Sequence, residues 1–208
     1  LSAASPTVVI SNPAAVNPTG TPAWDAAART LTTVIGGAAI EHLTHVTMKM
    51  TGFTSPRSER AASTLASVHT TVADNSIVDG PTSVTTDKIT AGALTGLLTF
   101  APATATPGVV SDATLKFSTA GVMERDGSIT IDLPKHGWHM DAQPGISVTF
   151  PSGMAAAGIW DASKSRLVVT TSVAHIPANT AVVIVVKGVR TPASERNSSI
   201  AHIRTYAK

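Results

Sequence analysis

The sequence contains no cysteine, so neither disulfide bonds nor thiolate metal ligands contribute to its fold. Only 13% of its residues are charged and 4% are aromatic, and the formal net charge is +2. A groove for nucleic acid needs clustered basic side chains and stacking aromatics, so we expect no nucleic-acid partner. No apolar run approaches the roughly 20 residues of a membrane-spanning helix, so no membrane span is expected.

What the sequence does contain is typical of β-strands. Hydrophobic residues make up 43% of the chain, and Ala, Val, Ile and Leu alternate with Thr and Ser. Residues of these types suit a pleated, half-buried sheet. A chain of 208 residues has room for two sandwich units of about 100 residues each. The composition therefore predicts an all-β protein with two units.

The strongest pattern is an internal repeat. Shifted by 136 positions, residues 24–60 align without a gap to residues 160–196, with thirteen identities. The identical positions of the first copy are Trp24, Asp25, Ala26, Leu31, Ala38, Ile40, Thr44, Val46, Gly52, Pro56, Ser58, Glu59 and Arg60. We expect two tandem, internally duplicated Ig-like antiparallel β-sandwiches with pseudo-two-fold similarity. The expected domains are residues 1–80 and 81–208.

Turn residues and β-branched runs predict the strands of each copy. In the second copy we expect strands at 114–119, 128–133, 146–150, 166–171, 180–186 and 199–206, with 180–186 central and closed by Gly188. In the first copy we expect strands at 7–11, 30–35, 44–50 and 64–71, and a turn of helix within 58–66. The first copy is therefore short of strands. Either residues 86–100 fold back to complete it, or the strands were lost by processing, or another subunit supplies them.

Residues that carry catalytic chemistry are sparse. His136 and His139 have one carboxylate close by, Asp141, so we interpret them as part of a surface turn. His42 and His45, three residues apart on an expected strand, point to opposite faces. No nucleophile, phosphate-loop or dinucleotide motif is present. We expect no catalytic residue, no metal site and no cofactor, and the protein is not expected to be an enzyme.

The repeated residues are better explained as structural positions. We expect Trp24 and Trp160 to fill equivalent cores, and Asp25 and Asp161 to hold turns. Three other groups of residues are further candidates for structural or assembly roles. We expect Trp138 to anchor its loop in the core, and Gly52 and Gly188 to occupy backbone positions closed to side chains. Ion pairs or loop clasps are expected at Glu59, Arg60, Glu195 and Arg196.

Residues 111–208 carry a resemblance to a known family. The resemblance begins with the segment Gly-Ser-Ile-Thr-Ile-Asp-Leu-Pro at residues 127–134, which is followed by a Trp. The later segments of the pattern are Val-Thr-Phe-Pro-Ser-Gly at 148–153, Trp160-Asp161, and Gly-Val-Arg-Thr-Pro at 188–192. This unit is similar to a repeat found in diatoms and related algae. A duplicated, cysteine-free β protein of that kind resembles the PyShell family, whose members tile around the Rubisco-rich pyrenoid of algal chloroplasts. The resemblance implies a chloroplast structural protein that supports carbon fixation and has itself, Rubisco or other pyrenoid proteins as partners.

Two further functions stay open. The same sandwich repeat and its Thr and Ser content are compatible with a secreted or cell-surface adhesion module, in which Trp24, Trp138 and Trp160 would contact carbohydrate. A polysaccharide-active enzyme would need a cleft with convergent carboxylates or histidines. The leading hypothesis is a non-catalytic protein that self-assembles into a sheet or tube, because an incomplete sandwich has an open edge.

Overall fold

The computed structural model describes residues 6–14, 16–19 and 21–208, and they contain strands, turns and loops but no helix. Consequently, these residues include no helix that could cross a membrane. The all-β prediction is confirmed, whereas the expected turn of helix within 58–66 is wrong: Arg60 forms a β-bridge with Ile89 and a strand starts at Ser63. The chain divides into two compact units, Leu1–Pro56 and Arg57–Lys208.

The first unit contains six short strands joined in pairs. They are β1 (Thr7–Asn12), β2 (Val16–Pro18), β3 (Ala23–Asp25), β4 (Thr30–Thr32), β5 (Ile35–Gly37) and β6 (Thr47–Thr51). The pairs β1-β6, β2-β5 and β3-β4 are all antiparallel. Among the described residues of this unit, the buried hydrophobic side chains are those of Val8, Ile10 and Val16. The unit therefore has a small core.

The second unit contains a hairpin and two four-stranded sheets. The hairpin consists of β7 (Ser63–Thr71) and β8 (Ile77–Thr86), which pair antiparallel. The other strands are β9 (Thr95–Pro102), β10 (Val110–Ser118), β11 (Ser128–Asp132), β12 (Ile146–Phe150), β13 (Ala155–Asp161), β14 (Arg166–Ser172), β15 (Ala181–Arg190) and β16 (His202–Tyr206). We name the sheet ordered β12-β15-β10-β9 the β10 sheet, and the sheet ordered β13-β14-β11-β16 the β11 sheet.

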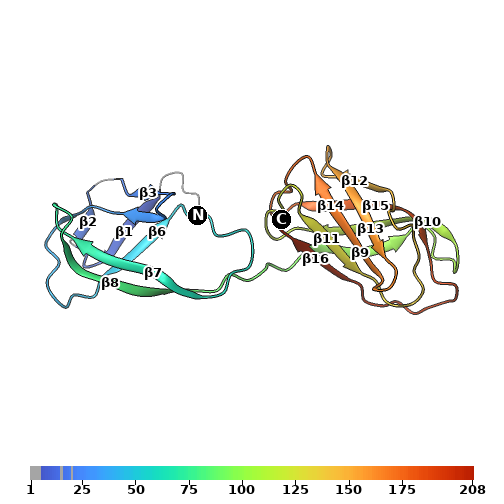
Figure 1. Ribbon diagram of the computed structural model, residues 1–208, viewed down its shortest axis with the longest axis horizontal. Coiled ribbons are helices and arrows are strands. Elements are labelled where there is room, and N and C mark those ends of the chain that lie inside the picture. The colour runs from blue at the N-terminus through green and yellow to red at the C-terminus, as the bar shows by residue number, and fades with distance from the viewer. Residues whose placement is uncertain (1–5, 15, 20) are drawn as a thin grey trace. The chain divides into compact units, whose positions relative to one another are not determined.

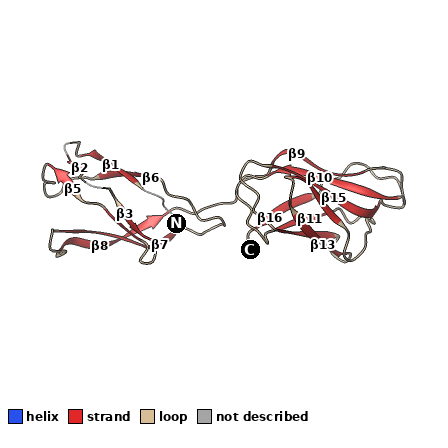
Figure 2. Ribbon diagram, turned by 90° about the horizontal axis from the view of Figure 1, so that it is seen from above, coloured by secondary structure: helices blue, strands red, loops and turns tan. Residues whose placement is uncertain are grey.

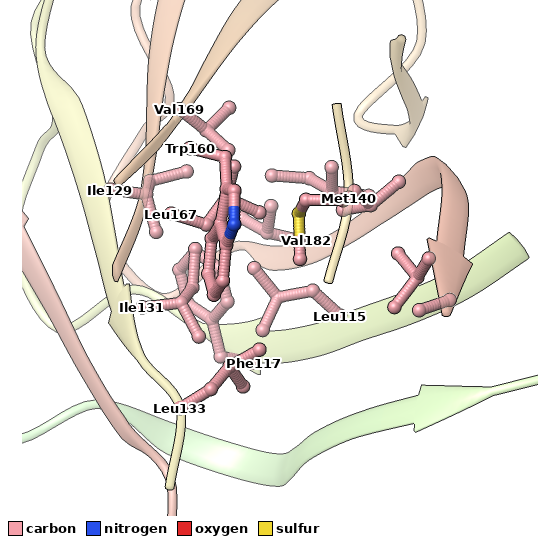
Figure 3. Packing of buried hydrophobic residues seen from close by; sticks show 14 of the residues in the cluster. Leu115, Phe117, Ile129, Ile131, Leu133, Met140, Trp160, Leu167, Val169 and Val182 are labelled. Atoms are coloured by element: carbon pink, nitrogen blue, oxygen red, sulfur yellow. The ribbon is translucent and has the colours of Figure 1, made fainter. Parts of the chain in front are cut away.

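The β10 sheet and the β11 sheet face each other as two layers, in a sandwich-like arrangement (Figures 1 and 2). Alternation along the strands sends apolar side chains inward, so that Leu115 of β10 and Leu167 of β14 are fully buried. The core cluster between the layers draws on both sheets and also takes in Trp160 (Figure 3). This core stabilises the second unit by burying apolar area.

The predicted strands are found with shifted ends. The run 180–186 is central, as expected, because β15 lies between β10 and β12. It does not end at Gly188: β15 continues to Arg190, and the register with β10 shifts between Ser111 and Ala113, opposite this glycine. The expected strand 30–35 is two strands, β4 and β5, which pair with different partners.

Two features of the domain organisation differ from expectation. The expected boundary after residue 80 falls inside β8, whose ladder with β7 crosses it, whereas the compact units divide after Pro56. Residues 86–100 do not complete the first copy. The strand β9 that begins within them pairs with β10 and so joins the second sandwich.

Candidate functional site

Each copy of the repeat contains one tryptophan in a hairpin of the same register. In the first copy Trp24 is paired with Leu31, and in the second Trp160 is paired with Leu167. Trp160 is only 6% exposed and lies in the core, whereas Trp24 is half-buried and packs edge-on against Phe53 at 6.0 Å. Both indole Nε1 atoms are buried without a hydrogen-bond acceptor among the described residues. Packing is therefore what holds these two side chains.

The two aspartates close the same turn. Asp25 Oδ1 accepts hydrogen bonds from the backbone N–H groups of residues 27 and 28 at 2.8 and 2.9 Å. Asp161 Oδ1 accepts the corresponding bonds from Ser163 and Lys164 at 3.0 and 3.2 Å. Hydrogen bonds, chiefly from Ser163 and then from Lys164, hold the pKa of Asp161 well below its ordinary value. The expected Asx turns are thus present, and both carboxylates are engaged in hydrogen bonds to the backbone of their turns.

Backbone conformation also repeats at the shift of 136. A positive φ angle is uncommon, especially outside glycine, because it crowds the side chain against the backbone. Four such residues in the first copy have a counterpart with positive φ 136 positions later. The pairs are Arg29 and Ser165, Gly37 and Val173, Leu43 and Asn179, and Gly52 and Gly188. The two segments therefore share turns as well as residues.

Gly52 and Gly188 have φ angles of 85° and 68°. We expected their positions to be closed to side chains, and for Gly188 the reason is conformational and not a lack of space. A Cβ atom built on Gly188 would meet nothing within 4 Å. The left-handed backbone itself disfavours a side chain there.

The Ser-Glu-Arg echo does not form the expected ion pairs. Among the described residues, neither Glu59 with Arg60 nor Glu195 with Arg196 makes a side-chain salt bridge, and all four are exposed. In the first copy a loop clasp is present instead, because Glu59 Oε1 accepts a hydrogen bond from the Ala91 N–H at 3.1 Å.

The histidines do not converge on a site. His136 and His139 are exposed on either side of Trp138, and no group of three metal-ligating side chains occurs in the described part of the chain. His42 and His45 are exposed as well. Trp138 is half-buried and packs edge-on against Phe100, with ring centroids 5.8 Å apart. It packs against the core cluster, as expected, and so anchors its loop.

A cluster of three charged side chains, an ion triad, lies on the β11 sheet. Asp132 accepts hydrogen bonds from Arg166 Nε at 2.5 Å and from an Arg204 guanidinium nitrogen at 2.7 Å. The hydrogen bond from Arg166 is the main cause that lowers the pKa of Asp132, with Arg204 adding to it against the opposing effect of burial. A carboxylate held by two cations is a structural element and a poor general base.

A surface groove of about 660 Å³ lies within the first unit. Its lining consists of Pro6, Thr7, Val8, Val9, Asn17, Pro18, Thr19, Thr21 and Pro22. These residue types contain no side chain that ionises near neutral pH. The groove can therefore contribute shape and hydrogen bonds, but its lining contains no acid or base for proton transfer.

The most unusual surface is the strand β6, because its counterpart in the second copy is fully enclosed. At the shift of 136, Met48 and Met50 correspond to Ile184 and Val186 of β15, which are 0% exposed. Met48 and Met50 are 37% and 50% exposed. The strand β15 has β10 on one side and β12 on the other, whereas β6 pairs with β1 and with no other described strand.

The partner strands of β6 and β15 correspond as well. Val8 pairs with Met50 as Ile146 pairs with Val186, and Ile10 pairs with Met48 as Val148 pairs with Ile184. Because β1 also precedes the tryptophan hairpin of its copy, as β12 precedes β13 and β14, β1 takes the place of β12. The place of β10 is not filled by a described strand of the first unit. One edge of β6 and part of its apolar face are left open.

Sequence reasoning identified the repeat and the shortage of strands, but not the open strand β6. The signal was present in the aligned residues, because Met-Lys-Met at 48–50 stands where the second copy has Ile-Val-Val.

Searches against protein-family models, curated proteins and solved structures find no match to this chain.

Proposed function

We propose that this protein is a non-catalytic structural protein, built from two copies of an Ig-like sandwich unit, which assembles with copies of itself into a sheet or tube. The observation that carries the proposal is the open edge of β6, which corresponds to an enclosed edge of β15. An unpaired strand presents N–H and C=O groups that a strand of another molecule satisfies.

Duplication is supported by local geometry in addition to sequence. The tryptophan hairpins share their register, the aspartate turns share their hydrogen bonds, and four positive-φ positions coincide at one shift. Two related units in one chain supply two related but unlike surfaces to each molecule. Contacts between unlike surfaces of successive molecules propagate into filaments and lattices when they do not close into a ring.

The resemblance to the PyShell family gives this proposal a location. We propose that the assembly surrounds the chloroplast pyrenoid, with Rubisco or other pyrenoid proteins on one face. A fluorescent fusion expressed in a diatom tests the location: a signal that outlines the pyrenoid is the expected result, and a signal at the cell surface would contradict it.

Electron microscopy of the purified protein tests the assembly. Negatively stained samples at increasing concentration are expected to contain sheets or tubes, and light scattering should show mass growing with concentration. A protein that stays monomeric at the highest concentration, with a native circular dichroism spectrum, would refute the proposal.

A second candidate function is adhesion through carbohydrate. The observation that favours it is the half-buried Trp138, whose ring is fixed by Phe100 and remains partly at the surface. Aromatic rings held in this way are a common platform for sugars. Binding to a glycan array that disappears in Trp138→Ala, with assembly unchanged, would favour this function over the first.

A further inference from the structure

We propose that β6 of one molecule pairs antiparallel with β6 of a second copy, around a two-fold axis at Met48, and so completes a four-stranded sheet in the order β1-β6-β6-β1. This inference names one contact of the proposed self-assembly and rests on it. A two-fold contact joins two molecules, so growth into a sheet or tube requires a further contact between the dimers. It commits to a second copy as the occupant of the open edge.

The first reason is strand order. In the second unit the counterpart of β6 is an inner strand of a four-stranded sheet, the β10 sheet. In the first unit the sheet that contains β6 has two strands. Two-stranded sheets are marginal in water, and three or more strands with an apolar face are needed for independent stability. Joining two molecules at β6 restores four strands and makes β6 an inner strand.

The second reason is that the side chains of β6 complement themselves. Cross-strand pairing with Val8 and Ile10 places Met50 and Met48 on the inward face of the β1-β6 sheet, and the strand period of two extends that face to Val46. With Met48 opposite Met48 of the second copy, Val46 lies opposite Met50. Three apolar pairs then line one face.

The second unit shows that the same two positions accept apolar partners. The strand β10 places Leu115 opposite Ile184 and Ala113 opposite Val186. These residues of β15 correspond to Met48 and Met50 of β6. In the proposed sheet, Met48 and Val46 of the second copy take the places of Leu115 and Ala113. Methionine suits such a surface, because its unbranched side chain adapts to irregular gaps.

Charge selects the register. The segment Thr47-Met48-Lys49-Met50-Thr51 is a palindrome, so a pairing centred on Lys49 would also match apolar residues. That pairing sets Lys49 directly opposite Lys49, and like charges in this position destabilise a sheet. Centred on Met48, the pairing sets Lys49 opposite Thr47 on the outward face. The lysine then does not oppose its own copy.

Single cysteines test this register directly, because the chain has no cysteine of its own. Residues opposite each other in antiparallel strands are close enough for a disulfide. Under mild oxidation Met48→Cys is expected to form a covalent dimer, and a mixture of Thr47→Cys and Lys49→Cys is expected to form the mixed dimer. Lys49→Cys alone is the matched control and should form little covalent dimer. In the proposed register position 49 of each molecule lies opposite Thr47, two positions along the strand from position 49 of the other molecule.

A charge at the axis tests the contact without oxidation. Met48→Asp sets two carboxylates against each other, and the protein is expected to lose at least tenfold in dimer affinity by analytical ultracentrifugation. Val9→Asp on the opposite, exposed face of β1 is the control and should dimerise like the original. Circular dichroism must show both variants folded.

Several outcomes would overturn the inference. Sheets or tubes that persist in Met48→Asp, together with no disulfide in Met48→Cys, would refute the β6 contact and leave the proposed function intact. A disulfide in Lys49→Cys but not in Met48→Cys would refute the register. A disulfide-linked dimer that never grows into larger assemblies would instead support the contact and refute the lattice.

Discussion

Replacement of Trp160 offers a quantitative test of how the second unit is stabilised. Trp160 is 6% exposed and belongs to the same core cluster as Leu115, Leu167 and Met140 (Figure 3). Truncating a buried tryptophan to alanine removes its apolar contacts and leaves a cavity, which costs about 3–5 kcal/mol. Domains of this size have roughly 5–15 kcal/mol of stability, so Trp160→Ala is expected to remove a large share of it.

Trp160→Phe separates packing from hydrogen bonding. The indole Nε1 is buried and has no acceptor among the described residues, and an unsatisfied buried donor costs about 1–3 kcal/mol. Phenylalanine keeps most of the apolar contact and deletes this donor. We therefore expect Trp160→Phe to cost about 2 kcal/mol or less, because the two effects offset each other.

Urea unfolding followed by far-ultraviolet circular dichroism measures these differences without relying on tryptophan emission. Trp24→Ala is the matched control in the other copy, and its cost should be smaller because Trp24 is only half-buried. If Trp160→Phe were as destabilising as Trp160→Ala, the indole N–H must make a hydrogen bond in solution, and the reasoning from packing alone would be refuted.

Three further changes have expected outcomes. Asp132→Asn breaks the triad with Arg166 and Arg204 and should lower the urea midpoint at pH 7. Because the folded-state pKa of Asp132 is lowered, the stabilisation from its charge is complete when the pH is above the ordinary aspartate pKa, and it is lost as the pH falls through the lowered pKa. The difference in stability between the original protein and Asp132→Asn should therefore shrink in acid. A difference that stays constant with pH would contradict the ion-pair assignment. Gly188→Ala should cost about 1–2 kcal/mol from its positive φ alone, whereas Gly121→Ala, equally unobstructed but without a positive φ, should be close to neutral; equal losses in urea unfolding would disprove the conformational explanation. Asp161→Ala should destabilise the protein more than Ser163→Ala, since Asp161 accepts the backbone N–H groups of the turn as well as the serine hydroxyl, and the order of the two melting temperatures checks this.

The hairpins and turns were predictable because their information is local. Trp-Asp followed by a polar turn and a β-branched run predicts two paired strands, and both copies form them. The strand β8 was not predicted, because Gly80 and Pro81 interrupt it and glycine and proline usually end strands. The pairing of β9 with β10 was not predicted either. Strand partners depend on contacts far apart in the sequence, which no local pattern encodes.

The candidate surface shows the same limit. Sequence alignment predicted that the first copy lacks strands, but it could not tell which edge this leaves open. The register and chain order of β1 and β6, set beside those of β12 and β15, place the gap where the second unit has β10. For Glu59, Arg60, Glu195 and Arg196 the sequence left an ion pair or a loop clasp open, and among the described residues the clasp of Glu59 with the Ala91 N–H is the one that forms. Its partner lies 32 residues away, which no local pattern indicates.

The residues of β6 fit an interface better than a core that has lost its cover. Where β15 has Val183 and Val185 on its outward face, β6 has Thr47 and Lys49, which suit water. Where β15 has Ile184 and Val186 inward, β6 has two methionines, which pack adaptably and tolerate partial exposure. A strand that had become solvent-exposed on both faces would have no need of apolar residues at alternate positions. Because β6 keeps the alternation, its inward face is suited to a partner, and a second copy of the same strand supplies one.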